Sequence, residues 1–248
     1  MRKLLWGACL VFTVPIAAHA ADHAAHWGYG GDHGPKSWGT MEPEFAACGL
    51  GKDQSPIDIR DAKVAALPAL DMHYKASSAE VVNNGHTVQV NLADGGELDL
   101  DGVAYRLVQF HFHTPSEEKI DGKASAMVVH LVHMSADGKV AVVAALVREG
   151  KTNAALDPVL GKLPQAEGKK STLASFNVGD IFPAHLGYYK YIGSLTTPPC
   201  TEGVRWQVLK EPIEASKGQI AAFRKLYPMN ARPVQPVNGR TIEQTPAA

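Results

Sequence analysis

The sequence predicts a single domain of the mainly β class, built on a large, twisted and mostly antiparallel sheet flanked by short helices. Short runs that alternate apolar and polar residues are separated by Gly, Asp or Asn along most of the chain, as expected of strands and turns. No internal repeat, low-complexity tract or linker divides residues 21–248, and a chain of this size often forms one all-β domain.

The first clear strands are predicted at 88–92 and 105–113, where apolar and polar residues alternate. Later strands are predicted at 188–193 and 204–209. Between these two groups, residues 126–134 and 140–148 flank a turn that contains Asp137-Gly138, so they are expected to form an antiparallel hairpin. The run 140–147 is apolar throughout, which favours a central strand covered on both faces.

Helical patterns are confined to two segments. Ser216 and Gln219 have the spacing of a capping box, in which each side chain accepts a hydrogen bond from the other residue's backbone N–H, and Pro228 would end the helix. A shorter helix is predicted within 154–160.

The first 20 residues have the pattern of a secretory signal peptide. Arg2 and Lys3 precede an uncharged apolar stretch that is too short for a membrane span, and Ala18-His19-Ala20 forms a small-residue cleavage site. We therefore expect a mature chain of residues 21–248 that is periplasmic or secreted, without membrane insertion. The net charge of −1 gives no reason to expect nucleic acid as a partner, and both a monomer and a homodimer remain open.

Cys48 and Cys200 are the two cysteines of this expected mature chain. An even pair in an exported protein usually forms a disulfide. The bond would close a loop of roughly 150 residues, which contributes at most about 4–5 kcal/mol in the chain-entropy model.

Four histidines form the most informative chemical pattern. His111 and His113 share one face of their strand, because successive side chains alternate. A third imidazole from the next strand would complete a three-nitrogen site with one open position, typical of catalytic zinc. His130 and His133 lie on opposite faces of that next strand, so only one can take part, and the alternation leaves the choice open.

Other polar residues near these strands are candidates for proton transfer or substrate contact. A buried Glu117 would orient a neighbour, His86 would carry protons near neutral pH, and the hydroxyls of residues 195–199 would face a substrate. Each has an ordinary alternative, namely a solvated acid, a surface histidine and local backbone hydrogen bonds.

Several motifs follow one another in an order that is far more specific than any single one. They are Gln54–Ile59, Asn83–His86, Gln109–His113, His130–His133, Ser194–Pro199 and Asn230–Pro236. Together they resemble the α-class carbonic anhydrases, in particular the bacterial exported branch, from Trp27 to Arg240.

The resemblance implies a zinc-dependent enzyme that reversibly hydrates carbon dioxide to bicarbonate and a proton, with Zn2+ in a conical cleft on the sheet. Zinc-bound hydroxide would attack carbon dioxide, and a histidine would carry the proton away. The zinc ligands would be His111, His113 and His130, with His133 a structural residue on the opposite face. A secondary esterase activity is plausible with the same nucleophile.

The other family roles carry over residue by residue. Thr196 would accept a hydrogen bond from the hydroxide and pass its own proton toward Glu117, while His86 would deliver protons to buffer. The Cys48–Cys200 disulfide would brace the Thr196 loop. The implied substrate-binding residues are Val132, Val142, Leu195, Thr196, Thr197, Val204 and Trp206, and the implied water-network and ligand-supporting residues are Tyr29, Asn84, Gln89 and Gln109.

Two positions depart from the family pattern. Val128 stands where the family usually has a glutamate that orients the third ligand, and loss of such a partner commonly costs about 10–100-fold in metal affinity or activity. Glu118 stands where the family commonly has a histidine. We expect a backbone carbonyl or a water to hold His130 instead, or zinc binding to be weaker.

Two rival functions keep the same fold: a binding protein without turnover and a zinc-buffering protein. A binding protein of this kind is expected to lack one or more zinc ligands, whereas all three matching histidines are present here.

Overall fold

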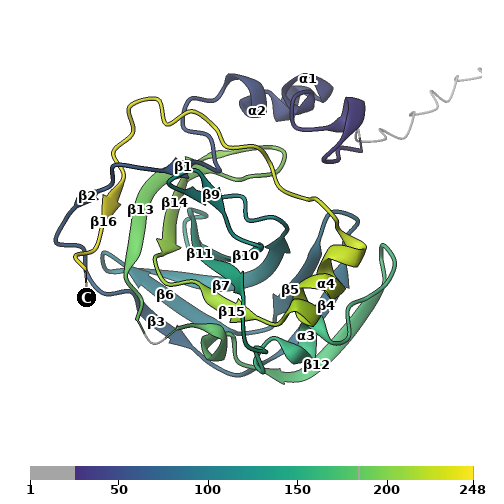
Figure 1. Ribbon diagram of the computed structural model, residues 1–248. Helices are drawn as coiled ribbons and strands as arrows, with labels where there is room; N and C mark the ends of the chain where they lie inside the picture. Colours follow the sequence, from purple (N-terminus) through teal and green to yellow (C-terminus); the bar gives the residue numbers. More distant parts are fainter. Residues whose placement is uncertain (1–25, 184, 248) are drawn as a thin grey trace, which may run out of the picture.

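A computed structural model describes residues 26–183 and 185–247 (Figure 1). The predicted signal peptide and its cleavage site lie outside the described residues. No helix in the described part of the chain is both long enough and apolar enough to cross a membrane.

A twisted sheet of 13 strands forms the body of the protein (Figure 1). Its main path runs in the order β12-β4-β5-β7-β10-β11-β14-β13-β16-β2, with β15 beside β11, and with β6 joining β3 to β7. A second sheet has three short strands in the order β1-β8-β9. The strands are β1 (Asp58–Ile59), β2 (Lys63–Val64), β3 (Asp71–Tyr74), β4 (Ser77–Asn83), β5 (Val88–Leu92), β6 (Gly96–Leu100), β7 (Val103–His113), β8 (Lys119–Ile120), β9 (Lys123–Ala124), β10 (Met127–Ser135), β11 (Val140–Glu149), β12 (Lys170–Phe176), β13 (Tyr188–Ser194), β14 (Glu202–Leu209), β15 (Ile213–Ala215) and β16 (Glu243–Gln244).

Most strand pairs are antiparallel, which confirms the predicted fold class. The predicted hairpin is present, with β10 and β11 in antiparallel register from Met127–Val147 to Met134–Val140. The structure adds parallel pairs that the sequence did not predict, because β11 pairs with β14 and β15, and β16 pairs with β2. The sheet is therefore mixed.

The centre of the sheet is covered on both faces, as the apolar run in β11 predicts. Ala141, Val143 and Ala145 pack in the larger apolar cluster with Phe110 and Phe112. The alternate residues of the same strand, including Val142 and Ala144, pack on the other side with Trp206. Removal of these side chains from water is the main force that holds the central strands together.

The helices are short and lie outside the sheet. They are α1 (Trp38–Met41), α2 (Ala47–Leu50), α3 (Asp157–Leu160) and α4 (Lys217–Leu226), with 3-10 turns at Gly31–His33, Pro43–Phe45 and Val178–Ile181. Ser216 and Gln219 form the predicted capping box at the start of α4. The helix predicted within 154–160 occupies only its second half, because the Asn153 side chain accepts hydrogen bonds from the backbone of Ala155 and Leu156 and holds them in a turn.

The chain between α4 and β16 crosses one end of the sheet, as the yellow segment in Figure 1 shows. Two buried residues fasten it there. Asn230 bonds to the end of β7 and the residues after it, and the Arg232 guanidinium donates to backbone oxygens of Ser55 and Cys48. The predicted disulfide joins Cys48 of α2 to Cys200, so the same end of the molecule carries a covalent bond.

Candidate metal centre

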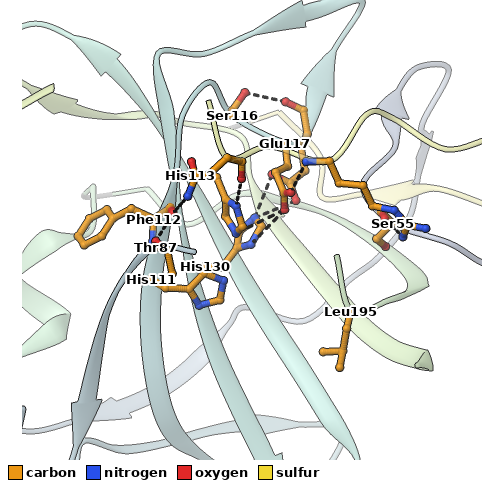
Figure 2. Close-up of polar contacts among 12 residues, drawn as sticks. Ser55, Thr87, His111, Phe112, His113, Ser116, Glu117, His130 and Leu195 are labelled. Atoms are coloured by element: carbon orange, nitrogen blue, oxygen red, sulfur yellow. Dashed lines mark hydrogen bonds and ion pairs between the residues drawn. The ribbon is translucent and has the colours of Figure 1, made fainter. Parts of the chain in front are cut away.

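Three histidines meet on one face of the central sheet. His111 and His113 alternate on β7, and His130 of β10 pairs directly with His111 across the antiparallel ladder. One ligand atom from each imidazole lies within 4.8 Å of the other two. Figure 2 shows His113 and His130 beside Glu117, with His111 next to them.

His133 lies on the opposite face of β10, as the resemblance implies. Its Nε2 is 2.8 Å from the Tyr74 hydroxyl, and the two rings stack. The side chain is fully buried away from the three clustered histidines. The structure thus brings His130, and not His133, to His111 and His113.

Each clustered imidazole has an oxygen partner on its second nitrogen. His111 Nδ1 lies 2.8 Å from the Gln109 side-chain oxygen, and His113 Nδ1 lies 2.7 Å from the backbone oxygen of Asn230. His130 Nε2 lies 3.0 Å and 3.2 Å from the two carboxylate oxygens of Glu118. Gln109 was predicted as a ligand-supporting residue, whereas Asn230 and Glu118 were not.

The donor set fits a zinc ion. Three imidazole nitrogens are a ligand set that zinc commonly takes, with a fourth position open. Among the described residues, the buried His113 Nε2 has no hydrogen-bond partner, so it is free to act as a ligand. Burial lowers the pKa of His111 to about 3 and also lowers the pKa of His113, which keeps both rings neutral. Burial also opposes protonation of His130, but the Glu118 carboxylate raises its pKa above the ordinary value.

Glu117 is buried beside the cluster and is not a solvated loop acid. Its Oε1 accepts a hydrogen bond of 2.7 Å from the backbone N–H of Arg232. Its Oε2 lies 3.5 Å from His113 Nε2 and 3.8 Å from His130 Nδ1. Burial raises the pKa of the carboxyl to about 7, while His130 and the Thr196 hydroxyl are among the groups that lower it. The Thr196 hydroxyl therefore lies near the Glu117 carboxylate, whose Oε2 has no hydrogen-bond partner among the described residues.

A cavity of about 320 Å³ opens over His111 and His130. Its wall is largely apolar and includes six of the predicted substrate-binding residues, namely Val132, Val142, Leu195, Thr196, Thr197 and Trp206. Val204 does not line this cavity, because its side chain is buried in the apolar cluster that contains Trp206. The wall also includes Val108, Met134 and Val140. Met134 and Val140 pair across the predicted hairpin, so its register would have identified both.

His86 does not line the cavity wall. Its half-buried ring stacks on Trp27, with centroids 3.7 Å apart and planes 7° apart, and His26 lies 5.4 Å away. Burial and the His26 charge lower the pKa of His86. The turn that carries His86 is held by Asn84 Oδ1, which accepts hydrogen bonds from the backbone of His86 and Thr87.

Two further predicted polar residues, Gln89 and Tyr29, lie outside the cavity wall. Gln89 pairs with His111 across β5 and β7, and its side-chain oxygen is 3.5 Å from Asn84 Nδ2. Tyr29 packs against Trp27 and Trp38, and burial together with the nearby Glu117 charge raises its pKa well above 10.

Known carbonic anhydrases resemble this chain over nearly its whole length. The sequence model of the family described as eukaryotic-type carbonic anhydrase matches residues 33–246. A carbonic anhydrase of Neisseria gonorrhoeae is 43% identical over 98% of this chain and 95% of its own, and one of Pectobacterium carotovorum is 42% identical over 94% and 96%. The structure of the α-carbonic anhydrase of Thermovibrio ammonificans, in complex with the inhibitor sulfanilamide, is 44% identical, with a TM-score of 0.87 over 88% of this chain and 99% of its own. The region matched by the family model includes the three histidines, Glu117 and Thr196.

Proposed function

The chain belongs to the eukaryotic-type carbonic anhydrase family, and we propose that it is a zinc enzyme that hydrates carbon dioxide reversibly to bicarbonate and a proton. One observation carries the proposal: three imidazoles, two buried and one partly buried, meet beside a largely apolar cavity. Zinc, when bound there, lowers the pKa of a coordinated water to about 7 and so supplies a nucleophile at neutral pH.

Glu117 and Thr196 orient that nucleophile. The Arg232 backbone N–H holds the Glu117 carboxylate in place, and the carboxylate would accept a hydrogen bond from the nearby Thr196 hydroxyl. A Thr196 oxygen whose proton points to Glu117 has only lone pairs left for the cavity, so it accepts a hydrogen bond there. Thr196 would therefore accept a hydrogen bond from the nucleophile, which would leave the nucleophile a lone pair for the substrate.

The cavity wall selects and holds the substrate. Val132, Val142 and Leu195 present apolar surface beside the histidines, which suits carbon dioxide, a small molecule without charge. Thr197 lines the same wall and is suited to hydrogen bonding with the more polar bicarbonate.

His86 transfers the proton from the site to buffer. Its half-buried ring is in reach of solvent, and histidine changes charge near neutral pH. We also propose that residues 21–248 form the catalytic domain and act in the periplasm or outside the cell. The Cys48–Cys200 disulfide supports that location, because such bonds persist in oxidising compartments.

Stopped-flow measurement of carbon dioxide hydration tests the function. We expect the purified protein to lose its hydration activity when a chelator removes zinc and to regain it when zinc is returned. His111→Ala should lose both zinc and activity, whereas the matched control His73→Ala, at an exposed histidine of β3, should keep both. A folded, zinc-loaded sample with no hydration above buffer would disprove the proposed function.

A further inference from the structure

Glu118 is a buried carboxylate with one partner. Its side chain is 0% exposed, and both of its carboxylate oxygens lie within 3.2 Å of His130 Nε2. In the described part of the chain, no other side chain or backbone group makes a hydrogen bond to that carboxylate. A buried charge is costly unless it is paired, so the contact with His130 accounts for the presence of this residue.

The contact determines which nitrogen of His130 is available to a metal. A neutral imidazole has one N–H and one nitrogen with a free lone pair. A carboxylate only accepts, so His130 Nε2 carries the proton, and Nδ1, which lies 3.8 Å from Glu117 Oε2, keeps its lone pair. Glu118 thus fixes both the tautomer and the angle of the ring.

The backbone around Glu118 is itself held in place. The Ser116 hydroxyl donates a hydrogen bond of 2.8 Å to the Glu118 carbonyl, and Lys119, the next residue, begins β8 and pairs with Asp58 of β1. A carboxylate on so constrained a segment loses little conformational freedom when it holds the imidazole.

Val128 offers no substitute for this carboxylate. It lies two residues before His130 on β10, fully buried in the apolar cluster with Val142 and Trp206. This is the position where the family resemblance leads one to expect a glutamate. The backbone carbonyl or water expected in its place is not what contacts His130, because Glu118 occupies the Nε2 side of the ring.

We propose that Glu118 is the positioning residue of the third zinc ligand, His130. From the segment just before β8, it replaces the carboxylate that is missing at Val128. The proposal rests on the zinc site of the proposed function. It makes this chain's metal affinity depend on a residue outside the strands that carry the histidines.

The test is a series of variants measured for zinc dissociation by chelator competition and for the visible spectrum of the cobalt(II) form. Glu118→Gln keeps the oxygen acceptor but removes the charge, and Glu118→Leu removes both the acceptor and the charge. We expect the zinc dissociation constant to rise in that order, by about 10–100-fold for the leucine variant. The cobalt spectrum should change in the same order, because it reports ligand geometry and a purely structural residue would not alter it.

Two further variants decide the outcome. Val128→Glu combined with Glu118→Leu should recover most of the zinc affinity, because residues 128 and 130 share one strand face. Glu214→Gln removes a partly buried carboxylate of β15 that binds Arg148, and should leave zinc affinity unchanged. Wild-type zinc affinity and cobalt spectrum in Glu118→Leu would overturn the proposal, and so would failure of the rescue. A wild-type protein that binds no zinc would instead overturn the proposed function.

Discussion

The proton transfer proposed for His86 needs a ring that is held in place and reaches solvent. Its ring stacks on Trp27, and the Asn230 side chain donates a hydrogen bond to its carbonyl, so its backbone is fixed while its ring edge meets solvent. Because burial lowers its pKa, the neutral ring predominates at neutral pH and can accept a proton from the site.

Replacing His86 with Ala should slow turnover where buffer is scarce. General acid–base groups contribute about 100-fold or more to rate, so we expect a loss approaching 100-fold in dilute buffer. Added imidazole should restore much of the rate, because a small base can then reach the site directly. Stopped-flow hydration at several buffer concentrations measures this.

Two observations separate proton transfer from a general loss of function. The zinc content of His86→Ala should match that of the wild type, because His86 makes no contact with the three clustered histidines in the described residues. The surface variant His73→Ala should behave as the wild type in every buffer. If the hydration rate of His86→Ala equalled that of the wild type at every buffer concentration, the transfer role would be ruled out.

At the scale of elements, the segment between α4 and β16 connects the histidine cluster to the rest of the fold. The backbone oxygen of Asn230 accepts from His113, and its backbone N–H donates to Thr114. Its side chain bonds to the backbone of Thr114, Phe112 and His86. One residue therefore places His113, the end of β7 and the His86 turn relative to one another.

Asn230→Ala should weaken both folding and zinc binding. Three side-chain hydrogen bonds are lost from a fully buried position, which costs about 3 kcal/mol in the free energy of unfolding at about 1 kcal/mol each. Because the Asn230 carbonyl then loses its anchor, the zinc dissociation constant should rise about 10-fold. Urea unfolding and chelator competition measure the two effects.

Ser216→Ala is the control for Asn230→Ala. It removes the cap of α4, which costs about 1 kcal/mol, and should leave zinc affinity unchanged. An Asn230→Ala protein that is destabilised but binds zinc as tightly as the wild type would show that this segment does not position His113.

The sequence predicts those elements that are determined by residues close together in the chain. The strand 88–92 and the β10–β11 hairpin follow from alternation and a turn, both of which lie within a few residues, and both are present. The parallel pairing of β11 with β14 and β15 is set by contacts between distant segments, and no short pattern reports it.

The same distinction applies to the metal centre. The i, i+2 spacing of His111 and His113 predicted a shared face, whereas the choice of His130 needed the family resemblance. Glu118 and the Asn230 carbonyl were missed because they approach the histidines from other segments. One signal for Glu118 was present, since a carboxylate appears at 118 in the same chain that lacks one at 128.

At the scale of the whole molecule, covalent and polar links gather at the end of the sheet that carries the site. The Cys48–Cys200 disulfide joins α2 to the loop that contains Thr196, and Arg232 donates to the carbonyl of Cys48 and stacks over Trp38. Within that loop, the backbone N–H of Cys200 bonds to Thr197. The loop that contains Thr196 is therefore tied to a residue 152 positions away from Cys200.

Loss of the disulfide should lower the stability of the whole domain. A closed loop of 152 residues restricts the unfolded chain, and the chain-entropy model assigns it at most about 5 kcal/mol. We expect Cys48→Ser combined with Cys200→Ser, or reduction of the wild type, to lower the free energy of unfolding by about 4 kcal/mol. The urea midpoint measures it, with zinc at a fixed saturating concentration so that ligand binding stabilises all samples alike. Wild type that is reduced and then reoxidised is the control and should recover the original midpoint. Equal midpoints for oxidised and reduced protein would mean that the fold does not depend on the bond, and would remove this support for an oxidising compartment.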